Sequence, residues 1–169
     1  FYDSNYIYIP TKYSEVEVVN NISDTEYLLS ATSSIVIENV KFQNARGVIK
    51  FVGGGKNSLE ITSCQFTNIL NTCIRYGGNG KNSDDPISTI RNSVFTNCAV
   101  CNGYSIYSEA TNLKDNYKLI IQDCVFTQDR DGVTFYKNAS AAVISYYDTL
   151  VDNCIFCNIV RAGIYFADG

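Results

Sequence analysis

The hexapeptide Ser63-Cys64-Gln65-Phe66-Thr67-Asn68 decides the fold, because its pattern recurs along the chain. Each copy has a polar residue, a small residue, any residue, Phe, any residue, and Asn or Gln. Subtracting successive Phe positions gives spacings of 24, 29, 31 and 30 residues. Repeats of this length are single supersecondary units that stack on one another. The other copies lie at residues 39–44, 92–97, 123–128 and 153–158.

Short β-rich runs flank each copy and are separated by Asn, Gly and Ser. In one unit, Leu59-Glu60-Ile61 precedes the motif and Cys73-Ile74-Arg75-Tyr76 follows it. No stretch carries the 3.6-residue apolar period of a helix over three turns. We therefore predict an all-β, right-handed parallel β-helix of about five to six coils. Residues 35–169 form its repeats, and residues 1–34 form an atypical first coil or cap of the same domain.

Two ladders should run along the stack, because equivalent residues on adjacent coils lie about 4.8 Å apart. The Phe residues should stack inside, each contributing roughly 1.5–3 kcal/mol. The Asn two places later suits a corner, since Asn tolerates left-handed backbone geometry and its amide can bond along the stack. The predicted ladders are Phe42, Phe66, Phe95, Phe126 and Phe156, and Asn44, Asn68, Asn97 and Asn158, with Gln128 in the fourth unit.

These units resemble those of the right-handed parallel β-helix, the fold of pectate lyases and of many surface adhesins. The Phe-x-Asn units with nearby Gly-Val or Gly-Ile segments also resemble, more loosely, the repeats of polymorphic outer-membrane proteins and autotransporter passengers. The resemblance covers about residues 35–166. The outer-membrane repeats usually space Phe and Asn one residue further apart. The resemblance implies either a surface structural role or chemistry on polysaccharides.

The amino-acid composition limits the binding partners and the cellular location that we expect. The 13 basic and 17 acidic residues include no basic cluster, so nucleic acid is not an expected partner. No apolar run of about 18 residues is present, and we expect no membrane span. Since the first residue is Phe1, we expect a processed chain or a segment of a longer one. Seven Cys in 169 residues indicate an extracellular or cell-surface location.

Three cysteines share the position two residues before Phe, namely Cys64, Cys124 and Cys154. The other units have Val40 and Ser93 there, so the position favours a stack of small buried side chains in which Cys acts as an apolar filler.

Disulfide bonds are the alternative role for cysteine. Cys73 and Cys101, seven and six residues after their Phe on adjacent coils, are the better candidates. Cys124 and Cys154 lie in register, where parallel side chains make bridging harder. Cys98 and Cys101 form a Cys-x-x-Cys pair, but with no second pair and no His we expect no metal site.

Carboxylates are the candidates for glycoside chemistry. The pair Asp84-Asp85 resembles the paired Asp of polygalacturonase-like enzymes, which also carry a Gly-His-Gly element that this chain lacks. Asp129 and Asp131 flank Arg130, and an exposed salt bridge between coils, contributing up to about 1 kcal/mol, explains this group more simply. We therefore expect no catalytic residues, no cofactor and no enzymatic activity.

Two sequons, at Asn21 and Asn138, make these residues glycosylation candidates, although chance matches are frequent in a chain rich in Asn and Ser. Four tyrosines recur at or next to the second-strand position. An outward row of them could stack on sugars or on a protein, but a partly buried stack is favoured. These residues are Tyr76, Tyr107, Tyr136 and Tyr165.

Open strand edges at the ends of such a stack must continue, be covered, or pair with another chain. The leading hypothesis is a secreted or cell-surface structural protein, either adhesin-like or a filament subunit that assembles by end-to-end β-stacking. The expected partners are further copies or a larger β-helical assembly, with surface glycans as a second class. The alternative is a carbohydrate-active enzyme or carbohydrate-binding module of the pectate-lyase type.

Overall fold

The computed structural model describes residues 16–19, 27–52, 57–78, 87–99, 103–110, 119–128, 139–145, 149–159 and 162–166. Within these ranges the chain forms strands and no helix, and all the strand pairings are parallel. None of the described segments is a helix long and apolar enough to cross a membrane. The predicted all-β parallel β-helix is confirmed.

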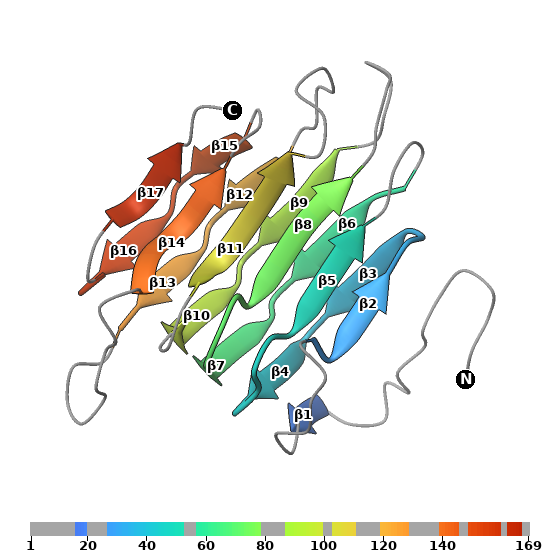
Figure 1. The fold of residues 1–169 in the computed structure, drawn as a ribbon, viewed down its shortest axis with the longest axis horizontal. Helices are drawn as coiled ribbons and strands as arrows, with labels where there is room; N and C mark the ends of the chain where they lie inside the picture. Colours follow the sequence, from blue (N-terminus) through green and yellow to red (C-terminus); the bar gives the residue numbers. More distant parts are fainter. Residues whose placement is uncertain are drawn as a thin grey trace.

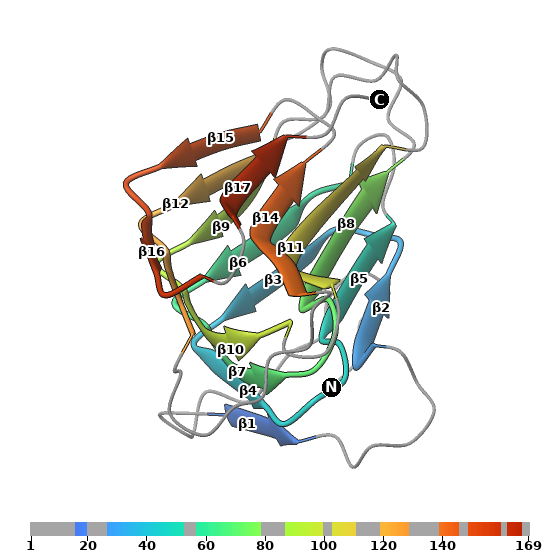
Figure 2. The same ribbon diagram turned by 60° about the vertical axis from the view of Figure 1, so that its left-hand side comes forward.

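Each coil visits three sheets in turn, which we number in that order (Figures 1 and 2). The first sheet contains β3 (Ile35–Glu38), β6 (Leu59–Thr62), β9 (Ser88–Arg91), β12 (Leu119–Gln122) and β15 (Thr149–Asp152). The second contains β1 (Val16–Val19), β4 (Val40–Gln43), β7 (Gln65–Ile69), β10 (Val94–Cys98), β13 (Val125–Thr127) and β16 (Ile155–Cys157). The third contains β2 (Leu29–Ala31), β5 (Ile49–Val52), β8 (Ile74–Gly78), β11 (Gly103–Ala110), β14 (Ala139–Ser145) and β17 (Ala162–Phe166).

Five three-stranded coils thus follow β1 and β2. Of residues 1–34, the structure describes 16–19 and 27–34. Here β1 adds a strand beside β4, with Val18 as the register partner of Phe42, and β2 adds a strand beside β5. The incomplete coil of β1 and β2 therefore has Val18 at the position where the five numbered coils have Phe. Whether residues 1–34 form a cap remains a prediction.

Alternation of apolar and polar residues along each strand builds the core. In β6, Leu59 and Ile61 are buried while Glu60 between them is exposed. Successive side chains of a strand point to opposite faces, so one face of every sheet lines a common interior. The Phe ladder lies there, with the rings of adjacent coils stacked at centroid distances of 5.2, 4.7, 4.7 and 4.9 Å for Phe42, Phe66, Phe95, Phe126 and Phe156 in order.

The corner after the second sheet has the left-handed geometry expected of Asn. Its φ angles are 54°, 54°, 52° and 57° at Asn44, Asn68, Asn97 and Asn158. Asn68 Nδ2 donates to Asn44 Oδ1, and Asn97 Nδ2 donates to Asn68 Oδ1, each over 3.3 Å. These bonds form the predicted ladder across three coils.

Gln128 departs from this pattern in the fourth coil. It is buried and does not have a positive φ, and its Nε2 donates to the carbonyl of Cys98 over 3.5 Å. The longer side chain thus reaches back to the backbone of the preceding coil.

A second left-handed corner lies between the first and second sheets, one residue before the small-residue column. Its residues are Asn39, Ser63, Asn92, Asp123 and Asn153, with φ from 47° to 56°. The polar residue that opens each hexapeptide is therefore a corner residue as well, a role that the pattern alone did not reveal. Two sharp corners per motif explain why the hexapeptide recurs so regularly.

Candidate functional site

The coil formed by β15, β16 and β17 is the last one that the structure describes, and no described strand lies on its far side. The strands β15, β16 and β17 each pair on one side, with β12, β13 and β14. On the other side no described strand pairs with them. On the outward faces of these strands, Leu150, Ile155 and Tyr165 are 57, 56 and 54% exposed. Strand edges that have no described partner strand, next to exposed apolar side chains, are the arrangement that invites another strand.

The inward side chains of the last described coil are less buried than those of the coil before it. Phe156 and Val151 are half-buried, whereas Phe126 and Ile121, their register partners one coil earlier, are fully buried. Their side chains match the columns of the interior coils but lack a neighbour on one side among the described residues. A further parallel coil placed there would bury them in the same way as their partners.

A second surface lies on the outward face of the third sheet. Lys50, Arg75 and Tyr107 occupy one register column on β5, β8 and β11, and Tyr165 occupies it on β17. The Arg75 guanidinium carbon lies 5.9 Å from the centroid of the Tyr107 ring. The ring of Tyr104 stacks on that of Tyr107 at 5.4 Å. We call this group the cation–aromatic surface.

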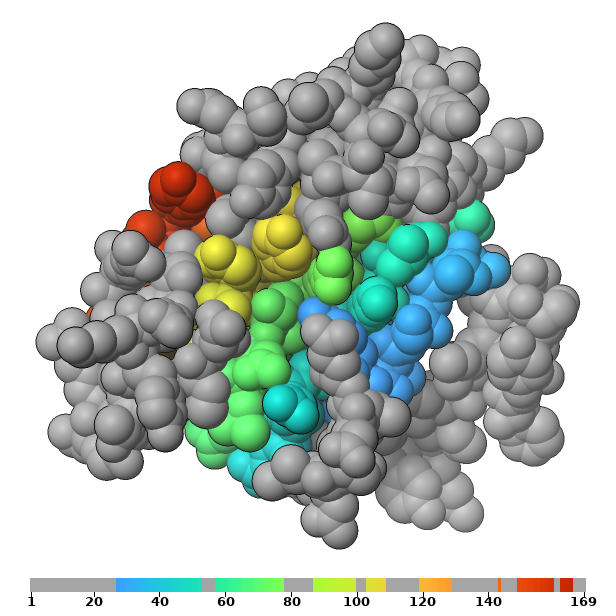
Figure 3. Space-filling model, in the orientation of Figure 1, coloured from blue at the N-terminus to red at the C-terminus, as the bar shows by residue number. Residues whose placement is uncertain are grey.

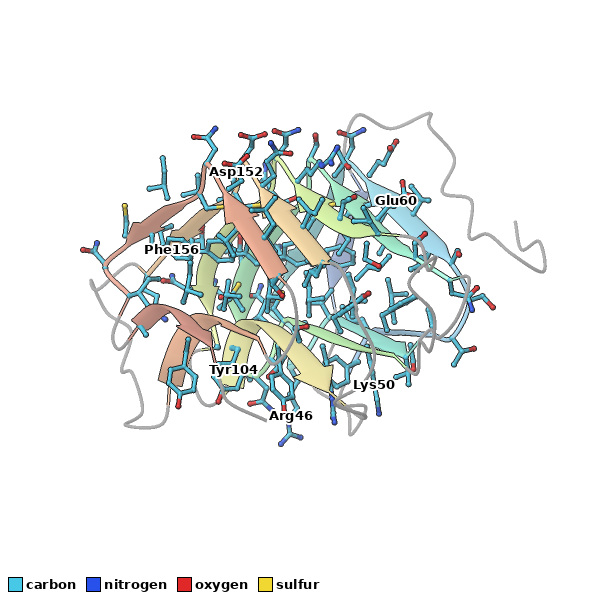
Figure 4. All side chains as sticks on the ribbon, turned by 90° about the horizontal axis from the view of Figure 1, so that it is seen from above. Arg46, Lys50, Glu60, Tyr104, Asp152 and Phe156 are labelled. Carbon is cyan, nitrogen blue, oxygen red and sulfur yellow. The ribbon has the colours of Figure 1, made fainter. Side chains whose placement is uncertain are left out.

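Lys50 and Tyr104 are the members of this surface that Figure 4 labels. Figure 3 shows side chains of successive coils as adjoining blocks across the face seen in Figure 1. In Figure 4, Arg46, Lys50 and Tyr104 lie on one side of the β-helix and Glu60 and Asp152 on the opposite side. Gln122 Nε2 donates to Asp152 Oδ2 over 3.0 Å on that opposite side. The cationic side chains labelled in Figure 4 therefore lie on the opposite side of the β-helix from the labelled carboxylates.

The predicted tyrosine row is split by the register of β8. Tyr76 points inward, is buried, and stacks on Phe51 at 5.7 Å. Its register partner is Ser108, whereas Tyr107 pairs with Arg75. A shift of one residue along a strand turns a side chain to the other face. Tyr76 therefore belongs to a buried stack, Tyr107 and Tyr165 face outward, and Tyr136 lies outside the described residues.

The cation–aromatic surface was missed by sequence reasoning, although a signal for it existed. In Cys73-Ile74-Arg75-Tyr76, the apolar Ile74 and the aromatic Tyr76 have the same parity, so both point inward and Arg75 points outward. If alternate residues had been counted from Ile74, instead of tyrosines being aligned by position, Arg75 would have been placed on the outward face, where Tyr107 also lies.

The column of small residues before Phe is a core element. Cys64, Cys124 and Cys154 each donate the thiol to two backbone carbonyls, at 3.2–3.6 Å. Ser93 occupies the same column and donates to the carbonyl of Arg91 over 2.8 Å. Burial raises the pKa of Cys124 to about 12 and raises the pKa values of Cys64 and Cys154 as well. These thiols stay protonated at neutral pH.

The disulfide candidates are free thiols where the structure describes them. Cys124 and Cys154 stand side by side as thiols, each bonded to carbonyls, and Cys73 is a fully buried thiol. Cys101 lies outside the described residues, so its pairing with Cys73 stays a prediction.

Several other predicted positions also fall outside the described ranges. These are the glycosylation candidates Asn21 and Asn138 and the carboxylates Asp84, Asp85, Asp129 and Asp131. Among the residues that the structure does describe, no group of three or more His, Cys, Asp or Glu is placed to hold a metal ion.

Comparison of the chain with protein-family models, with curated proteins and with solved structures found no match.

Proposed function

We propose that this chain is a structural β-helix of the extracellular or cell-surface type, which assembles when a further parallel coil is added to β15, β16 and β17. The observation that carries the proposal is the half-buried last coil. Its side chains repeat the interior columns, and its strand edges have no described partner. An adhesin-like or filament-forming role uses such an edge directly.

A second copy of the chain is the proposed occupant. The strands β3, β1 and β2 end the same three sheets on the opposite side of the stack. A copy that presents this edge would meet β15, β16 and β17 in the parallel sense used throughout the molecule. Such a head-to-tail contact joins two different surfaces and therefore generates an open filament instead of a closed dimer.

The stabilisation available is appreciable. Val151 and Phe156 are already half-buried, so completing their burial contributes roughly half of the 1.5–3 kcal/mol expected for burying a fully exposed side chain. A stacked partner for the Phe156 ring adds about 0.5–1.5 kcal/mol beyond area burial. Pairing three strand edges at once also adds inter-strand backbone hydrogen bonds of the kind that join the interior coils. These terms oppose the cost of association, which is several kcal/mol.

The test is self-association measured by analytical ultracentrifugation, with electron microscopy of the same samples. We expect the mass to rise with concentration and extended particles to appear. Val151→Lys places a charge at the open end and should block association. Leu150→Lys is the matched control, because Leu150 is the next residue on β15 and points outward. A wild-type chain that stays monomeric at high concentration without extended particles would overturn the proposal.

The cation–aromatic surface favours a second candidate function, that of a carbohydrate-binding module of the pectate-lyase type. Tyrosine rings stack on sugar rings, while Arg75 and Lys50 can pair with carboxylates of an acidic polysaccharide. Calorimetric titration with polygalacturonate and alginate tests it. We expect Tyr107→Ala to abolish binding and Thr67→Ala, on the second sheet, to leave it unchanged. Equal binding by both variants would remove this candidate.

The same polymers serve to test for enzymatic activity. Asp84, Asp85, Asp129 and Asp131 changed singly to Asn are the informative variants. Cleavage of any polymer by the wild type, lost in one of these variants, would favour a carbohydrate-active enzyme over the structural role.

A further inference from the structure

The outward faces of the first and third sheets lie on opposite sides of the β-helix. Figure 4 shows Glu60, from the first sheet, on one side and Lys50, from the third sheet, on the other. Lys50 lies between Ile49 and Phe51, which are fully buried, and the neighbours of Glu60 on β6 are fully buried as well. The core therefore separates the two faces, and a direct contact between them requires two molecules.

The outward face of the first sheet changes in character along the stack. Glu38 and Glu60 are exposed in the first and second coils, and Arg91 is exposed in the third. Leu150, in the fifth coil, is 57% exposed. Asp152, in the same coil, already accepts a hydrogen bond from a side chain of β12. This face thus presents, in order, two carboxylates, a cation and an apolar side chain.

The cation–aromatic surface on the third sheet has a matching order. Lys50 and Arg75 lie in the first and second coils, and in the same register column Tyr107 lies in the third coil and Tyr165 in the fifth. Tyr165 is 54% exposed. Because Tyr165 and Leu150 point outward from their strands, a further coil stacked on the end of the β-helix would not cover them.

We propose that the outward face of the first sheet docks on the cation–aromatic surface of a second copy of this chain, side by side and with equivalent coils at the same level. Charge complementarity selects this occupant, because the carboxylates of one face lie in the same two coils as the cations of the other. The opposed residues, from the first coil to the fifth, are Glu38 and Lys50, Glu60 and Arg75, Arg91 and Tyr107, and Leu150 and Tyr165.

These pairs differ in what they contribute. Exposed ion pairs are weak singly, so the two charged pairs mainly fix the alignment of the copies. A guanidinium group over a tyrosine ring, as in the pair of Arg91 and Tyr107, is attracted by the ring electrons. Leu150 and Tyr165 remove apolar surface from water when they meet.

Repulsion between like charges specifies the level at which the copies meet. Moving the second copy by one coil in one direction would oppose Arg91 to Arg75, which are both cations. Moving it by one coil in the other direction would leave Lys50 without a carboxylate opposite it on the partner copy. Only the level alignment brings opposite charges together in both of the first two coils.

This side-by-side contact goes beyond end-to-end stacking and does not depend on it. It uses outward side chains of the first and third sheets, whereas stacking uses the strand edges at the two ends. Because it joins two different surfaces, it repeats into an open row of copies. Where copies also stack, the same contact would bundle filaments that run in the same direction.

The test is cross-linking of an equimolar mixture of unlabelled and isotopically labelled wild type at low ionic strength, with a carbodiimide that joins an amine directly to a carboxylate. We expect linked peptides that join Lys50 of one copy to Glu38 or Glu60 of another, because the core prevents such a link within one molecule. Their yield should fall several-fold in about 1 M salt, where the Debye length is about 3 Å. End-to-end stacking does not place these residues together, and the wild-type map needs no variant to fold.

Charge reversal gives a second readout. Lys50→Glu and Glu60→Lys, each combined with Val151→Lys to remove end-to-end stacking, should weaken association at least about tenfold in analytical ultracentrifugation at low ionic strength and high protein concentration. An equimolar mixture of the two should restore association, because their reversed faces complement each other. Lys41→Glu, on the second sheet and in the same background, is the matched control and should leave association unchanged.

The outcomes separate this contact from the other proposals. Absence of mixed-label links at Lys50, or equal effects of Lys50→Glu and Lys41→Glu, would overturn it. Unlinked wild type that binds polygalacturonate through Tyr107 would also overturn it and would assign the surface to an acidic polysaccharide. Mixed-label links at Lys50 in a protein that forms no extended particles would support the side-by-side contact and remove only end-to-end stacking.

Discussion

The third and fifth coils both carry the repeated motif, but they bury its Phe side chain to different extents. In the third coil, Phe95 is buried and lies between two rings, each at 4.7 Å. In the fifth coil, Phe156 is half-buried and stacks on one ring, at 4.9 Å. The two motifs share both Asn and the Phe and differ by Ser to Cys, Val to Ile and Thr to Cys, whereas only the third coil has a described coil on both sides. A repeat unit in this fold therefore takes much of its stability from its neighbours.

The largest difference between the two coils should appear on removing a ring. Phe95→Ala should lower the free energy of unfolding by about 3–5 kcal/mol, because it leaves a cavity in the stack. Phe156→Ala should cost clearly less, because its ring is half-exposed. Denaturant unfolding at low protein concentration measures both values.

Protein concentration provides a second test of the difference between Phe95 and Phe156. If copies stack on the last coil, the cost of Phe156→Ala should rise with protein concentration while that of Phe95→Ala stays constant. Equal costs for the two substitutions at low concentration would contradict the view that the last coil is open.

Substitutions in the Asn ladder, at the corner after the second sheet, should lower the free energy of unfolding by a smaller amount. Asn97 has φ of 52° and donates to Asn68. Asn97→Ala should cost about 1–2 kcal/mol, because a residue with Cβ is strained in the left-handed region. Asn97→Gly removes the amide but not the backbone freedom, so it should cost less. Chemical denaturation of the two variants separates strain from hydrogen bonding, and a glycine variant as unstable as the alanine variant would assign the effect to the amide.

The pH dependence of stability should follow the buried thiols. Burial raises the pKa of Cys124 from 9.0 to about 12, so the folded state keeps this proton while the unfolded chain loses it. Stability should therefore be unaffected below pH 9 and fall as the pH rises from 9 toward 12, by about 1 kcal/mol between pH 9 and 10 for this thiol.

Cys124→Ser is the informative variant, because Ser93 fills the same column. Its stability should fall less steeply with pH than that of the wild type. Cys154→Ser, in the half-open last coil, should change the slope less. Identical slopes for wild type and Cys124→Ser in urea unfolding at several pH values would refute the assignment.

The smallest expected effect is a gain in stability. Ser108 Oγ is buried and has no hydrogen-bond partner within the part of the chain that the structure describes. Ser108→Ala should therefore stabilise the protein by up to about 1 kcal/mol. Ser93→Ala is the matched control and should destabilise, because Ser93 Oγ accepts from Cys64 N and donates to Arg91 O. Thermal unfolding of both variants checks the opposite signs.

Much of the fold could be predicted from the sequence, because the ladder residues are also local conformational signals. Phe66 marks the interior and Asn68 marks a corner that few other residue types tolerate, so repetition alone gives their register. The first corner was missed because Asn, Ser and Asp alternate there without a common side chain. The surface formed by Arg75 and Tyr107 was missed because it depends on strand parity in two different coils.

The sequence by itself determined the repeat, the parallel β-helix and the column in which each Phe lies, because these follow from spacing and from the strong preferences of Phe and Asn. Tertiary structure decided which tyrosines face the core, where Arg75 lies relative to Tyr107, and how far the last described coil is buried. Those properties depend on contacts between coils, where a shift of one residue or one missing neighbour reverses the environment of a side chain without altering the motif.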